Sequence, residues 1–403
     1  MANNKIKINK DIDLLELDKL YVELATLKKR KEILIDLIIP YEMKNDYLGL
    51  TPNIIQFVST WLRSENSGKL IIDVKKDYSK FLESISRNDY LFPLIGLVWN
   101  NNGVYDLDGN SLRKQLRTEL NKVFIKMAKV EALKGDKLLL TNLDHLPGDM
   151  GGLPCFESNG SYISNERDLA ISLEKVMIDD VLRNYGNDIH TIYKEVKKDL
   201  NSIVYELMKN TFEWAKTDEE GVPFDPNIRG VLIKMNKRVR TKLLDHYSSS
   251  KAISNFFENK RLKENDKGEV YFLEISVFDS GSGFIKKFKS LNKGNEDLTE
   301  LEIIKKCLIK HNTSAKGLNK SDKGIGLDRI LQILNGKGWL RIKTGKSCVY
   351  RNLITEPYIN IETDKIEEMK LFDWSKNSDV KFSDYQNVSG SVITIIYPLS
   401  INR

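Results

Sequence analysis

The chain has 403 residues, of which 41% are hydrophobic and 30% charged, and its formal net charge is +6 at pH 7. This composition is typical of a globular protein, and no segment approaches the roughly 18 consecutive apolar residues of a membrane-spanning helix, so we expect no membrane association. The lysines are interleaved with acidic residues instead of forming one basic block, which permits nucleic-acid binding without indicating it.

The cysteines and the N-terminal residues exclude further classes of protein. Cys155, Cys307 and Cys348 lie far apart without a C-x-x-C pair, which argues against a zinc site and against a disulfide framework. Residues 1–10 lack the apolar core of a secretion signal. We therefore expect a cytoplasmic protein.

Residues 1–160 have the pattern of a small α/β domain, for which we expect a regulatory or docking role. Leucines at helical spacing, followed by a second apolar stretch, predict one long helix or two over residues 11–39. Thr51 and Pro52 have the residue types of an N-cap and a first helical turn. The other predicted elements are a helix over 53–63, a strand at 69–74, a helix at about 111–133 and a buried strand within 135–146.

Residues 147–168 are rich in Gly, Pro, Ser and Asn, so we expect a linker or surface loop there and place a domain boundary at about 160. The remainder, 161–403, alternates helical and strand patterns and predicts a second α/β domain. Its predicted elements are helices at 166–185 and 188–216, a strand at 230–239, a charged helical insertion at 245–263, a strand at 269–279, helices at 298–311 and 327–335, and a final strand at 391–399.

The helix predicted at 188–216 carries a carboxylate and a carboxamide on one face. Glu206 and Asn210 stand four residues apart, so both side chains project from the same side of a helix. Taken alone, the pair is explained by a solvated polar stripe. Two glycine motifs further along the chain change that balance.

The first glycine motif, FDSGSGF, ends an apolar strand. Asp279, Gly281 and Gly283 form a D-x-G-x-G pattern, in which the glycines permit tight turns and the close approach of a ligand. An aspartate at this place can accept a hydrogen bond from an amine such as the exocyclic group of adenine. The same residue types are also common in turns, so the motif alone is weak evidence for a ligand-binding site.

The second glycine motif, KSDKGIGLDRIL, opens an amphipathic helix. Gly324 and Gly326 precede that helix, whose N-terminus presents backbone N–H groups and a positive dipole end to phosphate. Lys316, Lys320 and Lys323 add positive charge to the same loop. An ordinary helix start would explain this motif alone.

Together and in this order, the three motifs resemble the N-box and the two glycine boxes of the GHKL ATPase superfamily, which includes DNA gyrase, the ninety-kilodalton heat-shock chaperones, histidine kinases and MutL. The segment GSVITIIYP resembles the closing Gly-Thr strand of that family, with Ser391 in place of the threonine. The resemblance covers about residues 190–400. It implies a Bergerat-type α/β sandwich, in which a mixed sheet with helices on one face holds nucleotide beneath a mobile lid.

The resemblance also implies a role for each matching residue. Asp279 would accept the adenine amine with Ser391 assisting, and Asn210 would offer its carbonyl oxygen to Mg²⁺. Glu206 would be the catalytic residue that orients or deprotonates the water attacking the γ-phosphate. The other implied nucleotide contacts are Gly281, Gly283, Thr313, Ser314, Lys316, Lys323, Gly324, Ile325, Gly326 and Leu327.

The implied lid spans about 284–323, and one position near its end departs from the family pattern. Asp322 stands where many members have the first glycine of the second glycine box. An acid at that position either faces solvent or weakens phosphate binding.

The main interpretation is Mg²⁺-dependent ATP binding with slow hydrolysis, in which ATP orders the lid and changes how the N-terminal domain meets a partner protein or a second copy of the chain. Two alternatives stay open. One is a protein kinase acting on a partner, although His145 lacks the helix start of a phosphoacceptor histidine, which disfavours a histidine kinase. The other is an ATP-gated subunit without turnover, in a stress or phage-defence assembly.

Overall fold

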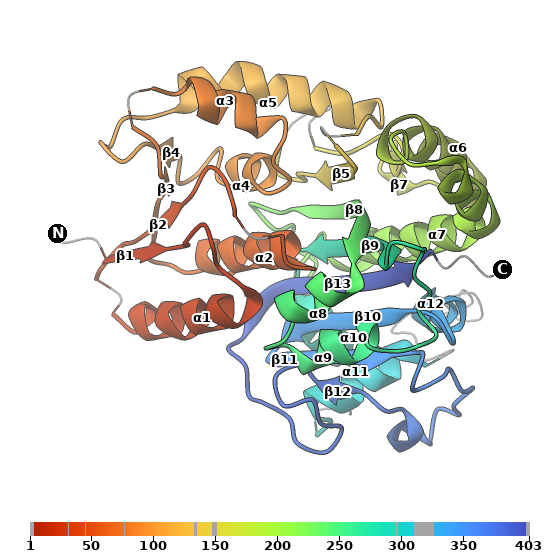
Figure 1. Ribbon diagram of the computed structural model, residues 1–403. Helices are drawn as coiled ribbons and strands as arrows, with labels where there is room; N and C mark the ends of the chain where they lie inside the picture. Colours follow the sequence, from red (N-terminus) through yellow and green to blue (C-terminus); the bar gives the residue numbers. More distant parts are fainter. Residues whose placement is uncertain are drawn as a thin grey trace.

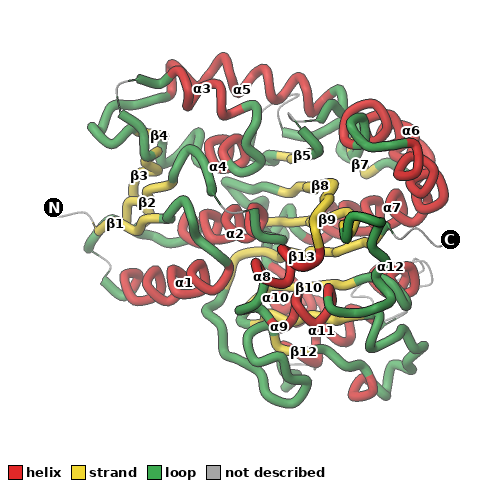
Figure 2. The backbone as a smooth tube through the Cα atoms, in the orientation of Figure 1, coloured by secondary structure: helices red, strands yellow, loops and turns green. Residues whose placement is uncertain are grey.

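The structure is a computed structural model, and it describes residues 4–30, 32–44, 46–75, 77–132, 135–146, 151–292, 294, 297–309 and 326–399. The described strands form a parallel sheet, an antiparallel sheet and a short hairpin, with helices packed around them (Figure 1). Helices and strands alternate along most of the chain (Figure 2). The expected α/β class is confirmed.

The N-terminal region is built on a four-stranded parallel sheet of order β1-β2-β3-β4. Parallel neighbours need a crossover connection, and helices supply most of those connections here. Its strands are β1 (Asn4–Lys7), β2 (Ile35–Ile39), β3 (Ser67–Ile72) and β4 (Val104–Tyr105), and its helices are α1 (Leu14–Lys28), α2 (Leu50–Leu62), α3 (Ser79–Ile85), α4 (Leu91–Leu97) and α5 (Arg113–Ala128).

The prediction of one or two helices over residues 11–39 is correct only for its first half. α1 begins after Asp13, whose side chain forms a reciprocal capping box with Glu16. The second apolar stretch is β2, in which every residue is buried between the neighbouring strands β1 and β3. A short apolar run of this kind does not separate a buried strand from a buried helix, because both faces of each are apolar. Likewise, α2 begins after Gly49, so Thr51 lies within the helix and does not cap it.

The larger sheet has seven strands in the order β12-β11-β10-β13-β9-β8-β5, and every described pairing in it is antiparallel. This corrects the mixed sheet that the resemblance implied. β9 and β10 do run in the same direction, but β13 lies between them and pairs antiparallel with both. The strands are β5 (Lys137–Asn142), β8 (Arg229–Val239), β9 (Glu269–Asp279), β10 (Trp339–Gly345), β11 (Ser347–Asn352), β12 (Phe372–Asp373) and β13 (Val388–Pro398).

One face of this sheet is covered by helices from the second half of the chain. α6 and α7 pack together, α7 contacts β8 and β9, and α10 contacts β10 and β13. The described helices of the second half of the chain are α6 (Glu166–Val176), which continues into a π-helical turn (Met177–Val181), α7 (Asn187–Trp214), α8 (Arg240–His246), α9 (Lys251–Phe257), α10 (Gly283–Leu291), α11 (Glu300–Leu308), α12 (Gly326–Leu334) and a 3₁₀ turn (Ile366–Glu368). Of these, α8 and α9 lie at the other face, where Phe257 of α9 contacts Phe272 of β9.

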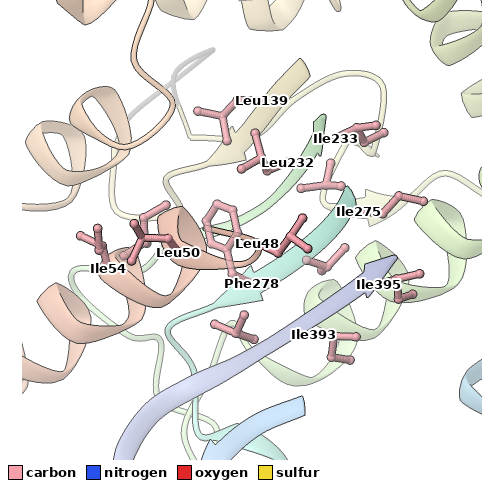
Figure 3. Packing of buried hydrophobic residues seen from close by; sticks show 14 of the residues in the cluster. Leu48, Leu50, Ile54, Leu139, Leu232, Ile233, Ile275, Phe278, Ile393 and Ile395 are labelled. Carbon is pink, nitrogen blue, oxygen red and sulfur yellow. The ribbon is translucent and has the colours of Figure 1, made fainter. Parts of the chain in front are cut away.

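The opposite face is covered by α2, which corrects the expectation of helices on one face only. Residues Leu50–Trp61 are all buried, because α2 lies between the parallel sheet and the strands β13 and β9. Trp61 donates its ring N–H to the carbonyl of Ile35 in β2, at 2.8 Å. Leu50 and Ile54 of α2 belong to the same cluster of buried hydrophobic residues as Phe278 of β9 (Figure 3). Since successive residues of β9 alternate between faces, Val277 and Asp279 point away from α2.

The two sheets do not separate at residue 160. β5 lies before that position, yet it pairs with β8 at the edge of the seven-stranded sheet. The segment expected to be a linker contains the hairpin of β6 (Glu157–Ser158) and β7 (Ser161–Tyr162). The Tyr162 hydroxyl donates to the carbonyl of Tyr205 in α7, and the Tyr205 hydroxyl donates to the carbonyl of Ile163. This hairpin is therefore docked on α7. None of the described helices is long and apolar enough to cross a membrane.

Candidate functional site

A cavity opens between α7, α10, α11, the start of α12 and the adjoining ends of β9 and β13. Most of the described residues that the sequence motifs singled out meet in its wall. They are Glu206, Asn210, Asp279, Gly283, Gly326, Leu327 and Ser391.

α7 supplies the carboxylate and the carboxamide. Its buried residues, among them Leu207, Met208 and Thr211, hold the helix against the sheet. That packing fixes the rotation of α7 about its axis and leaves Glu206 and Asn210 in the cavity wall, one helical turn apart. The expected shared face is thus present.

The two carboxylate oxygens of Glu206 have different surroundings. Oε1 accepts a hydrogen bond from Nη1 of Arg329 in α12, at 3.1 Å. Oε2 lies beside Gly326 at the start of the same helix, where an added β-carbon would approach it to 2.7 Å. A side chain at position 326 would therefore collide with the carboxylate, which gives this glycine a packing role beside its place in the motif.

Asp279 ends β9 at the other side of the cavity. In the sheet it stands opposite Ser391 of β13 and opposite Arg229 of β8. Its Oδ1 accepts a hydrogen bond from the N–H of Gly281, at 2.9 Å. Burial raises the pKa of Asp279 to about 7, although the hydrogen bond from Gly281 and the charge of Arg229 act in the opposite direction.

Gly281 positions the loop but does not line the cavity. A β-carbon on Gly281 would lie 2.6 Å from the Cα of Ala215, just past the end of α7. Gly390 is equally constrained, since its φ is +69° and a β-carbon there would approach the carbonyl oxygen of Asp279 to 1.9 Å. Both glycines let backbones meet closely, and so they set the position of the Asp279 carboxylate.

Ser391 is one of two neighbouring residues with hydroxyl groups, and the sequence predicted only Ser391 of the two. The Oγ of Ser391 and the Oγ1 of Thr344 lie 3.1 Å apart, and Thr344 also accepts a hydrogen bond from the N–H of Phe284. Thr344 stands opposite Ser391 in the pairing of β10 with β13. A threonine in a strand gives no local signal of this role, because the role comes from the strand pairing.

The cavity has further lining residues that the motifs did not indicate. Trp214, Phe284 and Phe288 give it an aromatic wall, and Lys209 and Lys287 add two cations. The ammonium of Lys287 donates to the carbonyl of Asp218 at 2.9 Å. Lys287 follows the D-x-G-x-G motif by four residues and starts no motif of its own, so only the fold places it here.

Behind the site, the buried guanidinium of Arg229 is paired with Asp144 and with Glu157. Burial by itself would lower the pKa of Arg229, but these carboxylates raise it. Asn227 extends the network by donating to Asp144 at 2.7 Å and accepting from the hydroxyl of Ser280, the residue after Asp279. The network ties the D-x-G-x-G loop to the hairpin that precedes α6.

Several predicted contacts lie outside the described residues. They are Thr313, Ser314, Lys316, Lys323, Gly324 and Ile325, together with Lys320 and Asp322. Of the implied lid, α10 and α11 are described. His145, in the loop after β5, has Nδ1 against the backbone of Asn227 and Nε2 3.2 Å from the carbonyl oxygen of Gly96.

Comparison of the chain with protein-family models, with curated proteins and with solved structures finds no match. Within the described ranges, no group of three or more His, Cys, Asp and Glu side chains could hold a metal ion. The site is therefore characterised by its own geometry: a half-buried carboxylate beside an arginine, a carboxamide one turn away, and a fully buried carboxylate at the far end.

Proposed function

We propose that the protein binds ATP together with Mg²⁺ and hydrolyses it slowly. The observation that carries this proposal is the convergence of separate chain segments on one cavity. α7, the end of β9, the start of β13 and the start of α12 each contribute a residue that the GHKL resemblance assigns to nucleotide. Such convergence is not required by the local reading of any one motif.

Asp279 is suited to the adenine base. Its carboxylate is buried at the end of β9, opposite Ser391 in the strand pairing, and hydrogen bonds to charged groups are worth about 1.5–3 kcal/mol in such places. An exocyclic amine would donate to the free lone pairs of this carboxylate, while the apolar wall near Phe284 and Phe288 would cover the ring faces. The base would then lie at the closed end of the cavity.

Asn210 fits the role of the protein ligand to Mg²⁺. A carboxamide oxygen is a donor that this ion accepts, and Mg²⁺ commonly takes one or two protein ligands together with phosphates and water. When bound, the ion would neutralise charge on the phosphates. Asn210 lies one turn from Glu206 in the cavity wall, so the ion-binding oxygen and the carboxylate would address the same phosphate group.

Glu206 fits the role of the residue that orients water. Its Oε1 is held by Arg329, whereas Oε2 points to the start of α12, where a phosphate would be held by backbone N–H groups. A water between Oε2 and the phosphate would be aligned and would lose its proton to this carboxylate.

The N-terminal region would respond to nucleotide through α2. Thr60 of α2 accepts from the N–H of Ser389 at 2.9 Å, and Arg63 donates to the carbonyl of Ser280 at 3.1 Å. These contacts reach the strand start before Ser391 and the loop after Asp279. A shift at the base end would thus be passed to α2, and through it to a partner protein or a second copy of the chain. The cytoplasmic location stays a prediction.

The experiment that tests this proposal is calorimetric titration of the purified chain with ATP, with and without Mg²⁺, alongside phosphate release from γ-labelled ATP. We expect saturable binding, a slow release of free phosphate, and weaker Mg²⁺-dependent binding in Asn210→Ala. Label transferred to protein would identify the kinase alternative, and binding without any release would identify an ATP-gated subunit. Absence of binding would overturn the proposal.

A further inference from the structure

Arg329 stands at the junction of three helices beside the cavity. From α12, its Nη1 contacts Oε1 of Glu206 in α7 and Oε2 of Glu166 in α6, each at 3.1 Å. Its Nη2 donates to the hydroxyl of Ser202 at 2.7 Å, and that hydroxyl donates to Oε1 of Glu166. The guanidinium is therefore held on both of its terminal nitrogens by groups that come from two other helices.

The geometry divides the two oxygens of Glu206 between two tasks. Ser202, Glu206 and Asn210 follow one another at four-residue spacing, so they share one face of α7. Arg329 binds the Oε1 oxygen of Glu206, on the side of Ser202. The Oε2 oxygen faces Gly326, toward the end of α12 that opens into the cavity.

Arg329 can bind Glu206 without cancelling the negative charge of the cluster. Two carboxylates share one guanidinium, so the cluster of Arg329, Glu206 and Glu166 carries one net negative charge. All three side chains stay partly exposed, at 34%, 17% and 28% respectively, which keeps their mutual attraction modest. Such a cluster orients its side chains more than it stabilises the fold, since a guanidinium group binds carboxylates with a defined geometry.

We propose that Arg329 is a positioning residue for the hydrolytic step: Glu166 and Ser202 orient its guanidinium, and the guanidinium holds Glu206 so that Oε2 meets the attacking water. This inference rests on the proposed function. It assigns Glu166 and α6 a part in catalysis although neither touches the nucleotide.

The main test compares Arg329→Ala with wild type in ATP binding and in steady-state hydrolysis. We expect kcat to fall about 10- to 100-fold, the effect of misplacing a reacting group by about an ångström, while the dissociation constant for ATP stays within about twofold. Glu166→Gln and Ser202→Ala, which are milder changes, should lower kcat less and in the same direction. Arg329→Lys should keep more of the rate than Arg329→Ala, since an ammonium group retains the charge of the guanidinium but not its two-pronged geometry.

A double-variant comparison separates positioning from direct action on phosphate. In a Glu206→Ala background, Arg329→Ala should change the residual rate by less than about twofold, because residues that act as a unit are non-additive. The inference is wrong if the rate losses of Glu206→Ala and Arg329→Ala multiply in the double variant. It is also wrong if Arg329→Ala weakens ATP binding about tenfold while ADP binding is unchanged, because Arg329 would then act on the phosphate.

Lys197→Ala is the matched control. Lys197 of α7 pairs with Glu174 of α6 at 2.6 Å, so this variant removes an ion pair between the two helices that Arg329 of α12 contacts, and neither residue lines the cavity. It should leave kcat unchanged. A loss equal to that of Arg329→Ala would show that general docking of α6 matters, which overturns the specific role. Failure of wild type to bind or hydrolyse ATP would instead refute the proposed function.

Discussion

Two carboxylate side chains, Asp279 and Glu206, line the cavity, and their surroundings differ. Asp279 is 9% exposed, and burial raises its pKa to about 7 although its carboxyl accepts a hydrogen bond from the backbone of Gly281. Glu206 keeps more contact with water and has a guanidinium against one oxygen. The Asp279 carboxyl is poised to gain or lose a proton near neutral pH, whereas the Glu206 carboxylate is oriented by its hydrogen bond from Arg329. The comparison teaches that two acids in one cavity can serve recognition and chemistry separately.

The largest expected effect comes from removing the paired carboxylate. Glu206→Ala should lower the rate of ATP hydrolysis by about 10²- to 10⁴-fold, the usual contribution of a general base, and should leave ATP binding nearly intact. Single-turnover phosphate release and calorimetry on the same preparation measure the two quantities. A variant that loses binding as well would erase the division of labour between the two carboxylates.

Removing the buried carboxylate should instead weaken ATP binding and leave the rate of hydrolysis nearly intact. Asp279→Asn replaces a charged acceptor with a neutral amide, and we expect ATP affinity to fall about 10- to 100-fold, which corresponds to about 1.5–3 kcal/mol for a hydrogen bond to a charged group. The rate at saturating ATP should change much less. Asp266→Asn, at an exposed aspartate that does not line the cavity, is the control and should bind as wild type does.

The raised pKa of Asp279 predicts two pH dependences. Because the folded pKa lies above the unfolded value, the protonated group favours the folded state, and this stability is present below about pH 4 and lost as the pH rises through about 7. We expect the free energy of unfolding of wild type, relative to Asp279→Asn, to fall by a few kcal/mol over that window. Urea titrations at several pH values measure it.

The affinity for ATP should depend on pH in the opposite direction from the stability. An amine donates to the carboxylate form, so binding below pH 7 must release a proton, and ATP affinity should rise with pH and level off above about 7. Calorimetry in two buffers of different ionisation enthalpy counts that proton. Equal heats at pH 6 would mean that Asp279 does not change its protonation on binding.

The smallest expected effect concerns the hydroxyl pair. Ser391→Ala removes one hydroxyl of the Ser391–Thr344 pair, opposite Asp279 in the sheet, and a typical net value of about 1 kcal/mol predicts an affinity loss of roughly fivefold. Thr344→Val should cost a similar amount. If either variant were as damaging as Asp279→Asn, the hydroxyls and not the carboxylate would dominate recognition of the base.

The sequence predicts those parts of the site that depend on local spacing. Glu206 and Asn210 share a face because a helix repeats every 3.6 residues, and Asp279 ends its strand because glycines follow it. Arg329 and Glu166 could not be found this way. Their meeting requires α6, α7 and α12 to pack together, and no pattern within any one helix encodes that contact.

The fold shows the same limit. β13 and β9 read as strands from their apolar alternation, yet nothing local places β13 between β9 and β10 or makes the sheet antiparallel. The helix predicted to extend to residue 39 is instead the strand Ile35–Ile39, a short segment in which four of the five residues are apolar, so that its pattern does not separate the two structures. The boundary expected at 160 misses the contribution of β5, since strand pairing joins residues about 90 positions apart in the chain.

The central claim is that the cavity recognises an adenine nucleotide through Asp279. Its most direct test is calorimetric titration of the wild-type chain with Mg²⁺–ATP and with the triphosphate of purine riboside, which lacks only the 6-amino group. We predict saturable binding of ATP and an affinity for the analogue at least about tenfold lower, as expected when a buried charged acceptor loses its donor. Equal affinities, or no heat with ATP, would contradict the claim.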